Sequence, residues 1–503
     1  MTCISIQRLL EGLLPQKDLP PCELMVRHVT ADSRLVQPGT LFLALPGSSQ
    51  HGFMFAEQAA QRGAVAIAVD PRGLPSGLPK VEYIPVWMIP GLASHSGLIA
   101  SRLLGHPSRK LWVAGITGTN GKTSCAHYIA QISPDPIGLI GTIGAGMPDA
   151  MTPLSHTTPD TTEIHYWLEH CASQHAKGVV MEVSSHALDQ QRTQNVCFDT
   201  AILTSIQRDH LDYHGSIERY AATKMKLFQQ PGLASAIIPA SDPWGPRFNE
   251  LSTSIPKRIA YATRSEFKPL QACAHLITEI TRSDEKGITL SFEGDFGTAQ
   301  AAVPLFGAFN AINLTTAIAT LLARDISLMD ILARLPRVRA VRGRMEKLGG
   351  AGCPNVVVDF AHTPDALHAA LLACRTHLRG GRLWCVFGCG GNRDQGKRSV
   401  MGAIAARWSD QIIITDDNPR SEPPDAITAQ IAAGLMGSEK PWMIEHDRFQ
   451  AIGRAISEAG ANDVILVAGK GHENIQDYGT EAIPFSDQLT VLSHLKMRDN
   501  MAC

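Results

Sequence analysis

Short apolar runs alternate along almost the whole chain with longer segments in which apolar residues recur at helical spacing. The runs are rich in valine, isoleucine and alanine, as strands buried on both faces usually are. They cover residues 64–69, 178–181, 201–204, 355–359, 383–387, 411–415 and 463–468. This alternation predicts an α/β fold, in which helices cover parallel sheets and ligands gather at the carboxyl ends of the strands.

The first residues carry a different pattern, typical of a short amphipathic helix that packs on the first domain. Its apolar face consists of Ile4, Ile6, Leu9, Leu10, Leu13 and Leu14. No basic segment with an apolar segment after it stands at this end, and no apolar run approaches the roughly 18 residues that a membrane-spanning helix needs. We therefore expect a soluble, cytoplasmic protein.

The length of 503 residues suggests about three domains at roughly 100–200 residues each. One break is expected near residues 105–108, before a strand, and another between residues 335 and 344, where a helical stretch ends. The predicted domains are residues 1–107, 108–337 and 338–503.

Composition limits the class of protein but names no activity. Acidic residues number 47 and basic residues 45, so the net charge of −2 gives no general attraction to nucleic acid or an anionic membrane. The eleven cysteines contain no CxxC pair, which indicates a reducing compartment. We interpret the closest two, Cys385 and Cys389, as packing residues at a strand end.

A glycine-rich run follows the apolar stretch 111–114 and leads into the helix-compatible segment 124–132. A strand, a glycine turn and a helix start in this order form a phosphate cradle, in which backbone N–H groups face the anion. Lys122 adds a positive charge and Thr123 offers a hydroxyl to Mg²⁺. An ordinary glycine turn is the alternative, but lysine and threonine directly after the second glycine argue against it. The run predicts an ATP site made by Gly118, Thr119, Asn120, Gly121, Lys122, Thr123 and Ser124.

Three further segments of the predicted second domain carry charged groups. Glu182 follows an apolar run, so it is either a Mg²⁺ ligand or a helix-capping or salt-bridged residue. Residues 208–215 hold two carboxylates and two imidazoles, which suit a metal site and an ion-pair network equally well. Lys224 lies one helical turn after Tyr220 and, taken alone, would be a solvated surface lysine.

Together these segments resemble the Mur ligases of bacterial cell-wall synthesis, relatives of the folylpolyglutamate synthetases. The resemblance rests on the compact G-T-N-G-K-T-S loop, on M-E-V-S-S-H, on R-D-H-L-D-Y-H-G and on Y-x-x-x-K. It implies an ATP-dependent ligase with a UDP-substrate-binding domain, a central P-loop-type parallel-sheet domain that binds ATP, and a Rossmann-like C-terminal domain for the amino acid. It also implies that Lys224 carries a carbamate made from CO₂, that Lys122, Lys224 and His210 are catalytic, and that the Mg²⁺ ligands are Thr123, Glu182, His210 and Lys224.

The same resemblance assigns substrate contacts. In the first domain Asp32-Ser33-Arg34 resembles a uridine-binding segment, with Ser33 as the polar contact. Nucleotide contacts in the later segments are implied for Asn310, Arg344 and Asp359. The residues implied to hold a UDP-muramoyl-dipeptide are Thr157, Thr158, Ser184, Gln190 and Arg192, in addition to Ser33.

The segment Asp417-Asn418-Pro419-Arg420 resembles the signature of the family branch that adds meso-diaminopimelate. This amino acid differs from lysine by a second carboxylate, so a selective site needs a fixed cation for that group and an anion for the distal ammonium. Arg393 and Arg420 can supply the first and Glu473 the second. Asp417, Asn418 and Gly469 complete the implied site. A turn with a surface arginine is the alternative.

We therefore expect an amide ligase that joins meso-2,6-diaminopimelate to UDP-N-acetylmuramoyl-L-alanyl-D-glutamate through an acyl phosphate, with ATP and Mg²⁺. It should act as a monomer on small molecules, without nucleic acid or membrane insertion. The D-N-P-R segment argues against a lysine-adding ligase. The uridine-type first domain argues against a folylpolyglutamate synthetase. A P-loop switch, a kinase or a nonenzymatic nucleotide-binding scaffold leaves the G-K-G-H-E segment at residues 469–473 unexplained.

Overall fold

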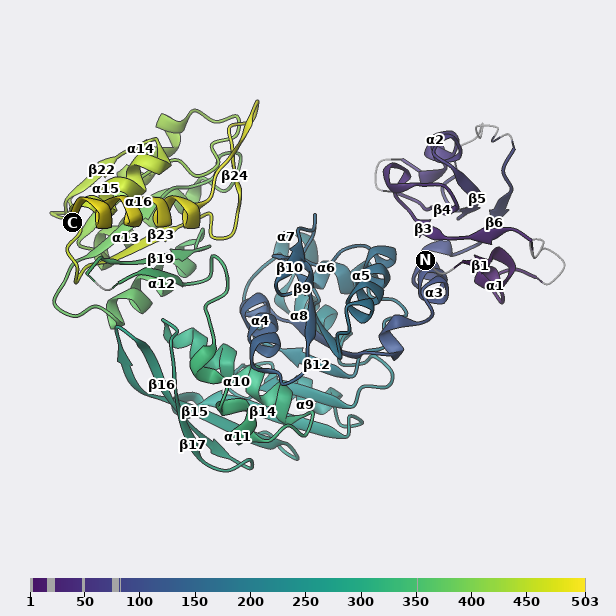
Figure 1. Ribbon diagram of the computed structural model, residues 1–503, viewed down its shortest axis with the longest axis horizontal. Coiled ribbons are helices and arrows are strands. Elements are labelled where there is room, and N and C mark those ends of the chain that lie inside the picture. Colours follow the sequence, from purple (N-terminus) through teal and green to yellow (C-terminus); the bar gives the residue numbers. More distant parts are fainter. Residues whose placement is uncertain are drawn as a thin grey trace. The chain divides into compact units, whose positions relative to one another are not determined.

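The computed structural model describes residues 3–15, 23–47, 50–74, 81, 83–350 and 352–502, and it consists of two compact units (Figure 1). The first unit comprises Met1–Ala260, Lys268–Ala274 and Ala319–Asp325. The second comprises Tyr261–Phe267, His275–Ile318 and Ile326–Cys503. The domain boundaries expected at residues 107 and 337 stay predictions.

The N-terminal part of the first unit is built on a four-stranded parallel sheet. Its strands, in spatial order, are β3 (His28–Thr30), β4 (Thr40–Ala44), β5 (Ala64–Val69) and β6 (Val86–Met88), with helices α2 (Ala56–Gln61) and α3 (Ser96–Leu103). All five residues of β4 are buried, because apolar clusters cover both faces of the sheet.

The predicted amphipathic helix is shorter than expected. Ile4–Ser5 forms strand β1, which pairs with β2 (Met25–Val26), and helix α1 covers only Ile6–Leu10. The chain leaves the helix at Glu11 and turns at Gly12, whose φ of +75° favours glycine. Ile6, Leu9 and Leu10 are fully buried, so the apolar face is correct although the helix length is not.

A larger mixed sheet forms the rest of the first unit. Its order is β10 (Ala150–Thr152), β9 (Gly144–Met147), β8 (Ile137–Gly141), β11 (Gly178–Glu182), β7 (Trp112–Thr117), β12 (Thr200–Leu203), β13 (Ser235–Pro239) and β14 (Lys257–Thr263), which runs into the second unit. Strands β8, β11, β7, β12 and β13 are parallel, whereas β9 and β10 add an antiparallel edge. The helices are α4 (Lys122–Ile132), α5 (Thr161–Ser173), α6 (Ser185–Asp189), α7 (Leu211–His214), α8 (Ile217–Met225) and α9 (Gly245–Leu251).

The register of this sheet brings three strand ends together. Glu182, the last residue of β11, lies beside Ile116 of β7, and Leu203 of β12 lies beside Thr117. The carboxyl ends of β7, β11 and β12 therefore meet at one edge. This is where ligands of parallel α/β sheets bind.

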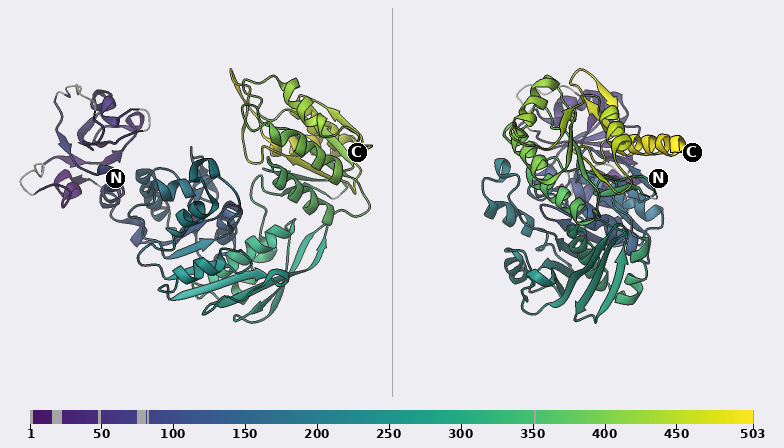
Figure 2. Two further views of the ribbon diagram at one scale, coloured as in Figure 1. Left: turned by 180° about the vertical axis from the view of Figure 1, so that it is seen from behind. Right: turned by 90° about the vertical axis from the view of Figure 1, so that its left-hand side faces the viewer.

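The second unit contains an antiparallel ribbon and a doubly wound sheet (Figure 2). The ribbon strands are β15 (Ala274–Asp284), β16 (Gly287–Gly294) and β17 (Ala299–Val303), followed by α10 (Ala308–Leu322), which ends in the first unit, and α11 (Leu328–Leu332). The doubly wound sheet has the order β18 (Glu346–Gly349), β19 (Asn355–Asp359), β23 (Val464–Ala468), β20 (Leu383–Phe387), β21 (Gln411–Ile414) and β22 (Trp442–Ile444). Only β18 is antiparallel to its neighbour. A hairpin of β24 (Ile475–Asp477) and β25 (Ala482–Pro484) follows the sheet.

Helices cover both faces of this doubly wound sheet. One buried cluster joins the strands to α12 (Pro364–Thr376), α13 (Gly396–Trp408) and α14 (Pro424–Ala433). A second joins them to α15 (Arg448–Glu458) and α16 (Asp487–Ala502). The predicted α/β class and the Rossmann-like third domain are confirmed, and all seven predicted strands are present within a residue or so at their ends.

Two smaller expectations can be compared with the described residues. The nine described cysteines are free thiols, and Cys385 and Cys389 are buried packing residues as predicted. Within the described part of the chain, no helix has both the length and the apolar character needed to cross a membrane.

A buried ion pair between the first residues of α15 and α16 yields a stability prediction. Arg448 Nε lies 2.7 Å from Asp487 Oδ1 and its Nη2 lies 2.8 Å from Oδ2, and both side chains are fully buried. Asp487→Ala leaves the guanidinium buried without its carboxylate, so we expect the free energy of unfolding to fall by about 3–5 kcal/mol. Scanning calorimetry measures this, with Glu458→Ala in the exposed Arg454–Glu458 pair as the control. Equal small effects of the two variants would contradict the assignment.

Candidate active site

The glycine-rich loop connects the end of β7 to the start of α4, as the sequence predicted. Gly118 has φ +146° and Gly121 has φ +83°, conformations that disfavour a side chain. A Cβ atom on Gly118 would lie 1.9 Å from Thr204 Oγ1. Thr119 N–H also donates to Ser205 O at 2.7 Å. The loop is therefore fixed against the end of β12 by close backbone approach.

Two lysine ammonium groups bind the same carbonyl oxygen of this loop. Lys122 Nζ donates to Gly118 O at 2.8 Å and Lys224 Nζ donates to it at 3.0 Å. Lys224 is only 1% exposed, so its interpretation as a solvated surface lysine is wrong. Burial lowers the pKa of Lys224 well below its usual range, the charge of Lys122 lowers it further, and Asp209 opposes the shift. Burial and Lys122 thus act in the same direction, against the charged form of Lys224.

The Glu182 carboxylate lies beside the loop at the end of β11 and is 2% exposed. Its Oε2 accepts from Thr123 Oγ1 at 2.9 Å and from Thr142 Oγ1 at 3.1 Å, and its Oε1 accepts from Thr142 N–H at 2.8 Å. Neither the helix-cap nor the salt-bridge alternative describes these contacts. A carboxylate next to a threonine hydroxyl supplies the hard oxygen donors that Mg²⁺ prefers.

The segment from Asp209 to His214 forms a cluster of rings. His210 has φ +51°, and its Nε2 lies 3.5 Å from Asp209 Oδ2. Its ring packs on His186 at 4.8 Å between centroids. Within the described part of the chain, no group of three or more His, Cys, Asp or Glu side chains is arranged to hold a metal ion. The contacts of this segment in the structure are thus ring packing and one histidine–carboxylate pair.

The residues expected to hold the UDP-linked substrate lie next to Glu182. Thr158 Oγ1 donates to Glu182 O at 2.9 Å and lies 3.3 Å from Ser184 Oγ. Arg192 Nη1 donates to Thr158 O at 2.8 Å, and its Nε donates to Gln190 Oε1 at 2.9 Å. The structure thus brings these four together.

Two further residues of that expected set are placed separately. Thr157 Oγ1 lies 3.1 Å from Thr142 Oγ1, which links it to the Glu182 group. Ser33 lies in the N-terminal part of the unit, where its buried hydroxyl donates to Gln58 Oε1 at 2.8 Å.

In the second unit, two of the three expected nucleotide residues, Arg344 and Asp359, lie near the end of β19. The Arg344 guanidinium lies 4.7 Å above the centre of the Phe360 ring, and Asp359 Oδ2 accepts from Met345 N–H at 2.8 Å. Burial raises the pKa of Asp359, while the charge of Arg344 opposes the rise. Asn310 is buried on α10 and donates to Phe306 O at 2.7 Å.

The residues expected to bind the amino acid surround Lys470, which is fully buried. Its Nζ donates to Asn418 Oδ1 at 2.8 Å and to Glu473 Oε2 at 3.2 Å, and lies 3.6 Å from Asp417 Oδ1. Asn418 Nδ2 also donates to Glu473 Oε2 at 2.9 Å. Gly469, with φ +121°, passes so close to Asp417 that a Cβ atom would lie 3.3 Å from its Oδ2. We call Asp417, Asn418, Lys470 and Glu473 the Lys470 network.

Arg420 lies beside this network, in a left-handed conformation with φ +53°. Its Nη1 donates to Gly391 O at 2.8 Å, and its Nε lies 3.4 Å from Asp477 Oδ2. Asn392 Oδ1 accepts from Ser421 Oγ at 2.8 Å, which connects the loop of residues 390–394 to the residue after the D-N-P-R segment. Arg393 lies on the same loop and is exposed.

Comparisons with known proteins show the family of the chain. Three family models match the chain in order: the Mur ligase family catalytic domain at residues 25–98, the Mur ligase middle domain at 116–321 and the Mur ligase glutamate ligase domain at 343–471. The UDP-N-acetylmuramoyl-L-alanyl-D-glutamate–2,6-diaminopimelate ligase of Alkalilimnicola ehrlichii is 41% identical over 500 residues, which cover 97% of this chain and 99% of that protein. The chain belongs to the Mur ligase family.

Further relatives support this assignment. The ligase of the same name from Chromobacterium violaceum is 44% identical over 488 residues, covering 95% of this Mur ligase and 94% of that protein. A solved structure of a UDP-N-acetylmuramoyl-L-alanyl-D-glutamate–2,6-diaminopimelate ligase matches with a TM-score of 0.71 and 30% identity, over 99% of this chain and all of that one.

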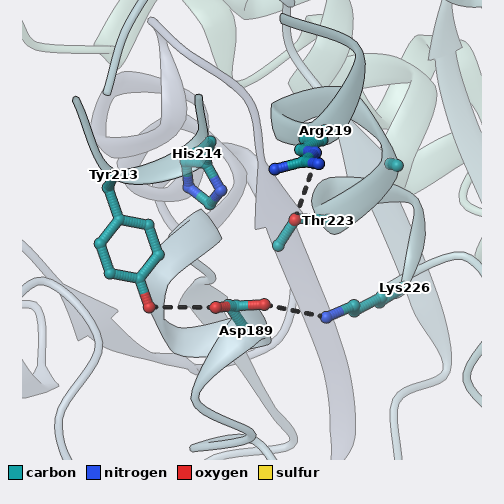
Figure 3. Close-up of a pocket in the computed structure, with 7 residues that line it drawn as sticks. Asp189, Tyr213, His214, Arg219, Thr223 and Lys226 are labelled. Atoms are coloured by element: carbon teal, nitrogen blue, oxygen red, sulfur yellow. Dashed lines mark hydrogen bonds and ion pairs between the residues drawn. The ribbon is translucent and has the colours of Figure 1, made fainter. Parts of the chain in front are cut away.

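Sequence reasoning did not single out several residues that the structure of this Mur ligase connects to the site. Thr142 binds Glu182 with two groups, and its signal was its position directly after the apolar run of β8. Lys470 belongs to the G-K-G-H-E segment, which the sequence analysis noted, but the sequence did not indicate that this lysine binds three neighbouring side chains. Asp189 and Tyr213 line a surface cavity of about 350 Å³ and gave no separate signal (Figure 3).

Proposed function

We propose that this Mur ligase adds meso-2,6-diaminopimelate to UDP-N-acetylmuramoyl-L-alanyl-D-glutamate in peptidoglycan precursor synthesis, with ATP as the energy source. The observation that carries the proposal is the Lys470 network beside Arg420, in a chain up to 44% identical to ligases with this name. In that network Asp417 and Glu473 provide two negative charges and Lys470 one positive charge. A second carboxylate and a distal ammonium are the groups that such charges can recognise.

The reaction has two steps. The γ-carboxylate of the D-glutamyl residue attacks the γ-phosphorus of ATP, and ADP leaves as the acyl phosphate forms. The amine of diaminopimelate then attacks the acyl carbon, loses a proton and displaces phosphate to give the amide. No protein nucleophile takes part, so positioning and charge neutralisation by the Gly118–Ser124 loop and Lys122 account for the chain's contribution.

Thr123, Glu182, His210 and Lys224 are proposed to hold Mg²⁺. The hydroxyl of Thr123 and the carboxylate of Glu182 lie 2.9 Å apart and are both suitable oxygen ligands. Bound Mg²⁺ would neutralise the charge of the transferred phosphoryl group. Gly121 and Ser124 complete the proposed loop contacts to the phosphates. Their backbone N–H groups lie at the start of α4.

Lys224 is proposed to act as a carbamate. Its neutral amine would attack CO₂ and lose a proton, which replaces a neutral amine beside Lys122 with an anion. The lowered pKa of Lys224 supports this chemistry because only the unprotonated amine reacts. The carbamate would give the metal a second anionic oxygen ligand beside Glu182, from a lysine and not from an acidic residue.

The remaining assignments complete the proposal. Thr157, Thr158, Ser184, Gln190 and Arg192 would hold the muramoyl-dipeptide and Ser33 the uridine end, while Asn310, Arg344 and Asp359 would contact ATP. Arg393 and Arg420 would bind the second carboxylate of diaminopimelate. The partners proposed are these small molecules alone, for a monomer acting in the cytoplasm without nucleic acid or membrane insertion.

A product assay tests the function directly. The protein is incubated with ATP, Mg²⁺, UDP-muramoyl-dipeptide and either diaminopimelate or lysine, and the products are weighed by mass spectrometry. We expect a product heavier by diaminopimelate minus water. Lys122→Ala should form none, because the lysine charge faces the transferred phosphoryl group. Lysine as the preferred substrate would overturn the assigned branch, and normal turnover of folded Lys122→Ala would overturn the assigned loop.

The carbamate yields a second prediction. Lys224→Ala should lose about 10³-fold in kcat, and added acetate should restore about tenfold by replacing the missing metal-directed anion. Wild-type enzyme with acetate is the control and should gain nothing. Carbon-13 NMR under labelled CO₂ should show a carbamate signal in the wild type that Lys224→Ala lacks. Full activity of Lys224→Ala without acetate would contradict the proposal.

Amino-acid selectivity yields a third prediction. Arg420→Ala should lose about 10²-fold in kcat/KM for diaminopimelate and far less for lysine, because only diaminopimelate brings the carboxylate that the guanidinium binds. Arg454→Ala, which removes an arginine from the exposed face of α15, is the control and should leave both values unchanged. Side-by-side kinetics decide the matter, and an unchanged preference in Arg420→Ala would show that Arg420 does not bind the second carboxylate.

A further inference from the structure

A small surface cavity of about 350 Å³ lies among helices α6, α7 and α8, and Asp189 binds two partners on its wall (Figure 3). The Tyr213 hydroxyl donates to Asp189 Oδ2 at 3.0 Å, and Lys226 Nζ donates to Asp189 Oδ1 at 3.2 Å. Asp189 is the last residue of α6, Tyr213 belongs to α7, and Lys226 directly follows α8. One carboxylate therefore connects three helices.

We propose that Asp189 and Tyr213 are positioning residues, whose hydrogen bond holds α7 so that His210 is presented to the reaction site. The proposal rests on the function proposed above, in which His210 takes part in metal binding. Asp189 and Tyr213 would thus act through His210 and not by direct contact with the substrates.

A continuous series of ring contacts leads from Tyr213 to His210. The Tyr213 ring packs on His186 with centroids 4.3 Å apart, and His186 packs edge-on against His210 at 4.8 Å. The backbone adds a second connection, because Tyr213 N–H donates to His210 O at 3.2 Å. A displacement of Tyr213 would therefore reach His210 through both the rings and the main chain.

The conformation of His210 explains why such support is needed. Its φ of +51° places a non-glycine residue in the left-handed region, which costs of order 1 kcal/mol and persists only where neighbours enforce it. His214 holds the buried side of α7 through a 3.0 Å contact between its Nε2 and Ser185 Oγ. Tyr213, on the exposed side, adds its hydroxyl bond, its ring contacts and its backbone bond to His210.

Asp189 also connects this segment to the proposed substrate residues. Gln190 follows it directly, and Arg192, which binds Gln190, donates to Thr158 O. The Asp189–Tyr213 bond therefore joins the end of α6 near the proposed muramoyl-dipeptide contacts to the α7 segment that carries His210.

The charge of Asp189 strengthens this bond. The hydrogen bond from Lys226 lowers the pKa of Asp189, and the bond from Tyr213 adds to this effect, so the carboxylate is ionised at neutral pH. A hydroxyl donates more strongly to an ionised oxygen than to a neutral one. Asp189 and Lys226 are 42% and 47% exposed, so the ion pair itself contributes little to stability and its effect is on geometry.

The kinetic test uses Tyr213→Phe, which removes the hydroxyl but keeps the ring, together with Asp189→Ala and the double variant. We expect each single variant to lower kcat about tenfold, as loss of one positioning interaction does, with KM for ATP and the thermal midpoint almost unchanged. The double variant should lose no more than one single variant, since both remove the same bond. Asp325→Asn, in the surface Lys257–Asp325 pair of the same unit, is the control and should leave kcat unchanged.

A spectroscopic measurement tests positioning without ligation. The ring signals of His186 and His210 in NMR spectra should shift in Tyr213→Phe. The signals of His28 in β3, whose ring stacks on Tyr166 of α5, should not shift. A tenfold lower kcat with unmoved His210 signals would overturn the proposal, and so would a normal kcat in Tyr213→Phe. A wild-type protein that makes no product would overturn the proposed function instead, and the NMR result would still decide whether Tyr213 positions His210.

Discussion

The pairing register of three parallel strands determines where all other groups of the first unit's site can lie. Because β7 pairs with β11 on one side and β12 on the other, Thr117, Glu182 and Leu203 end at one level of the sheet. The phosphate loop leaves β7 at that level, between the Glu182 carboxylate and the backbone that follows β12. A slip of one residue in the β7–β11 pairing would turn Glu182 to the opposite face of the sheet and separate it from Thr123.

Charge is the second constraint on this site. Two lysine Nζ groups on the Gly118 carbonyl would repel one another if both were charged, and burial and the charge of Lys122 both lower the pKa of Lys224. The nucleotide and the proposed carbamate would each add negative charge at this point. The positive charge at the loop would therefore be better compensated when the negative charge of the nucleotide and the carbamate is present. Phosphoryl transfer requires positive groups at such a position.

Much of the fold follows from the sequence, and the exceptions have physical causes. Apolar runs buried on both faces predicted strands such as β5, β19 and β20 to the residue, because no other element suits them. The burial of Lys224 could not be inferred from its own segment, since it depends on β7 and the loop more than a hundred residues earlier in the chain. Thr142, Lys470 and Asp189 were likewise missed because each owes its importance to partners distant in sequence. The motifs predicted candidate residues for the site, but only the tertiary structure shows which of them bind one another.

In the second unit, the balance of charge in the Lys470 network indicates what the site lacks. Asp417 and Glu473 carry two negative charges, Lys470 carries one positive charge, and the buried Arg448 interacts with both carboxylates from α15. Asp417 Oδ1 has no hydrogen-bond partner among the described residues, which is unfavourable for a buried carboxylate oxygen, so one additional N–H donor there would stabilise the network. Arg420 lies beside this network and is paired with the Asp477 carboxylate. For Arg420 to bind the second carboxylate of diaminopimelate, as proposed above, that carboxylate would have to take the place of Asp477, whereas lysine would leave the Arg420–Asp477 pair intact.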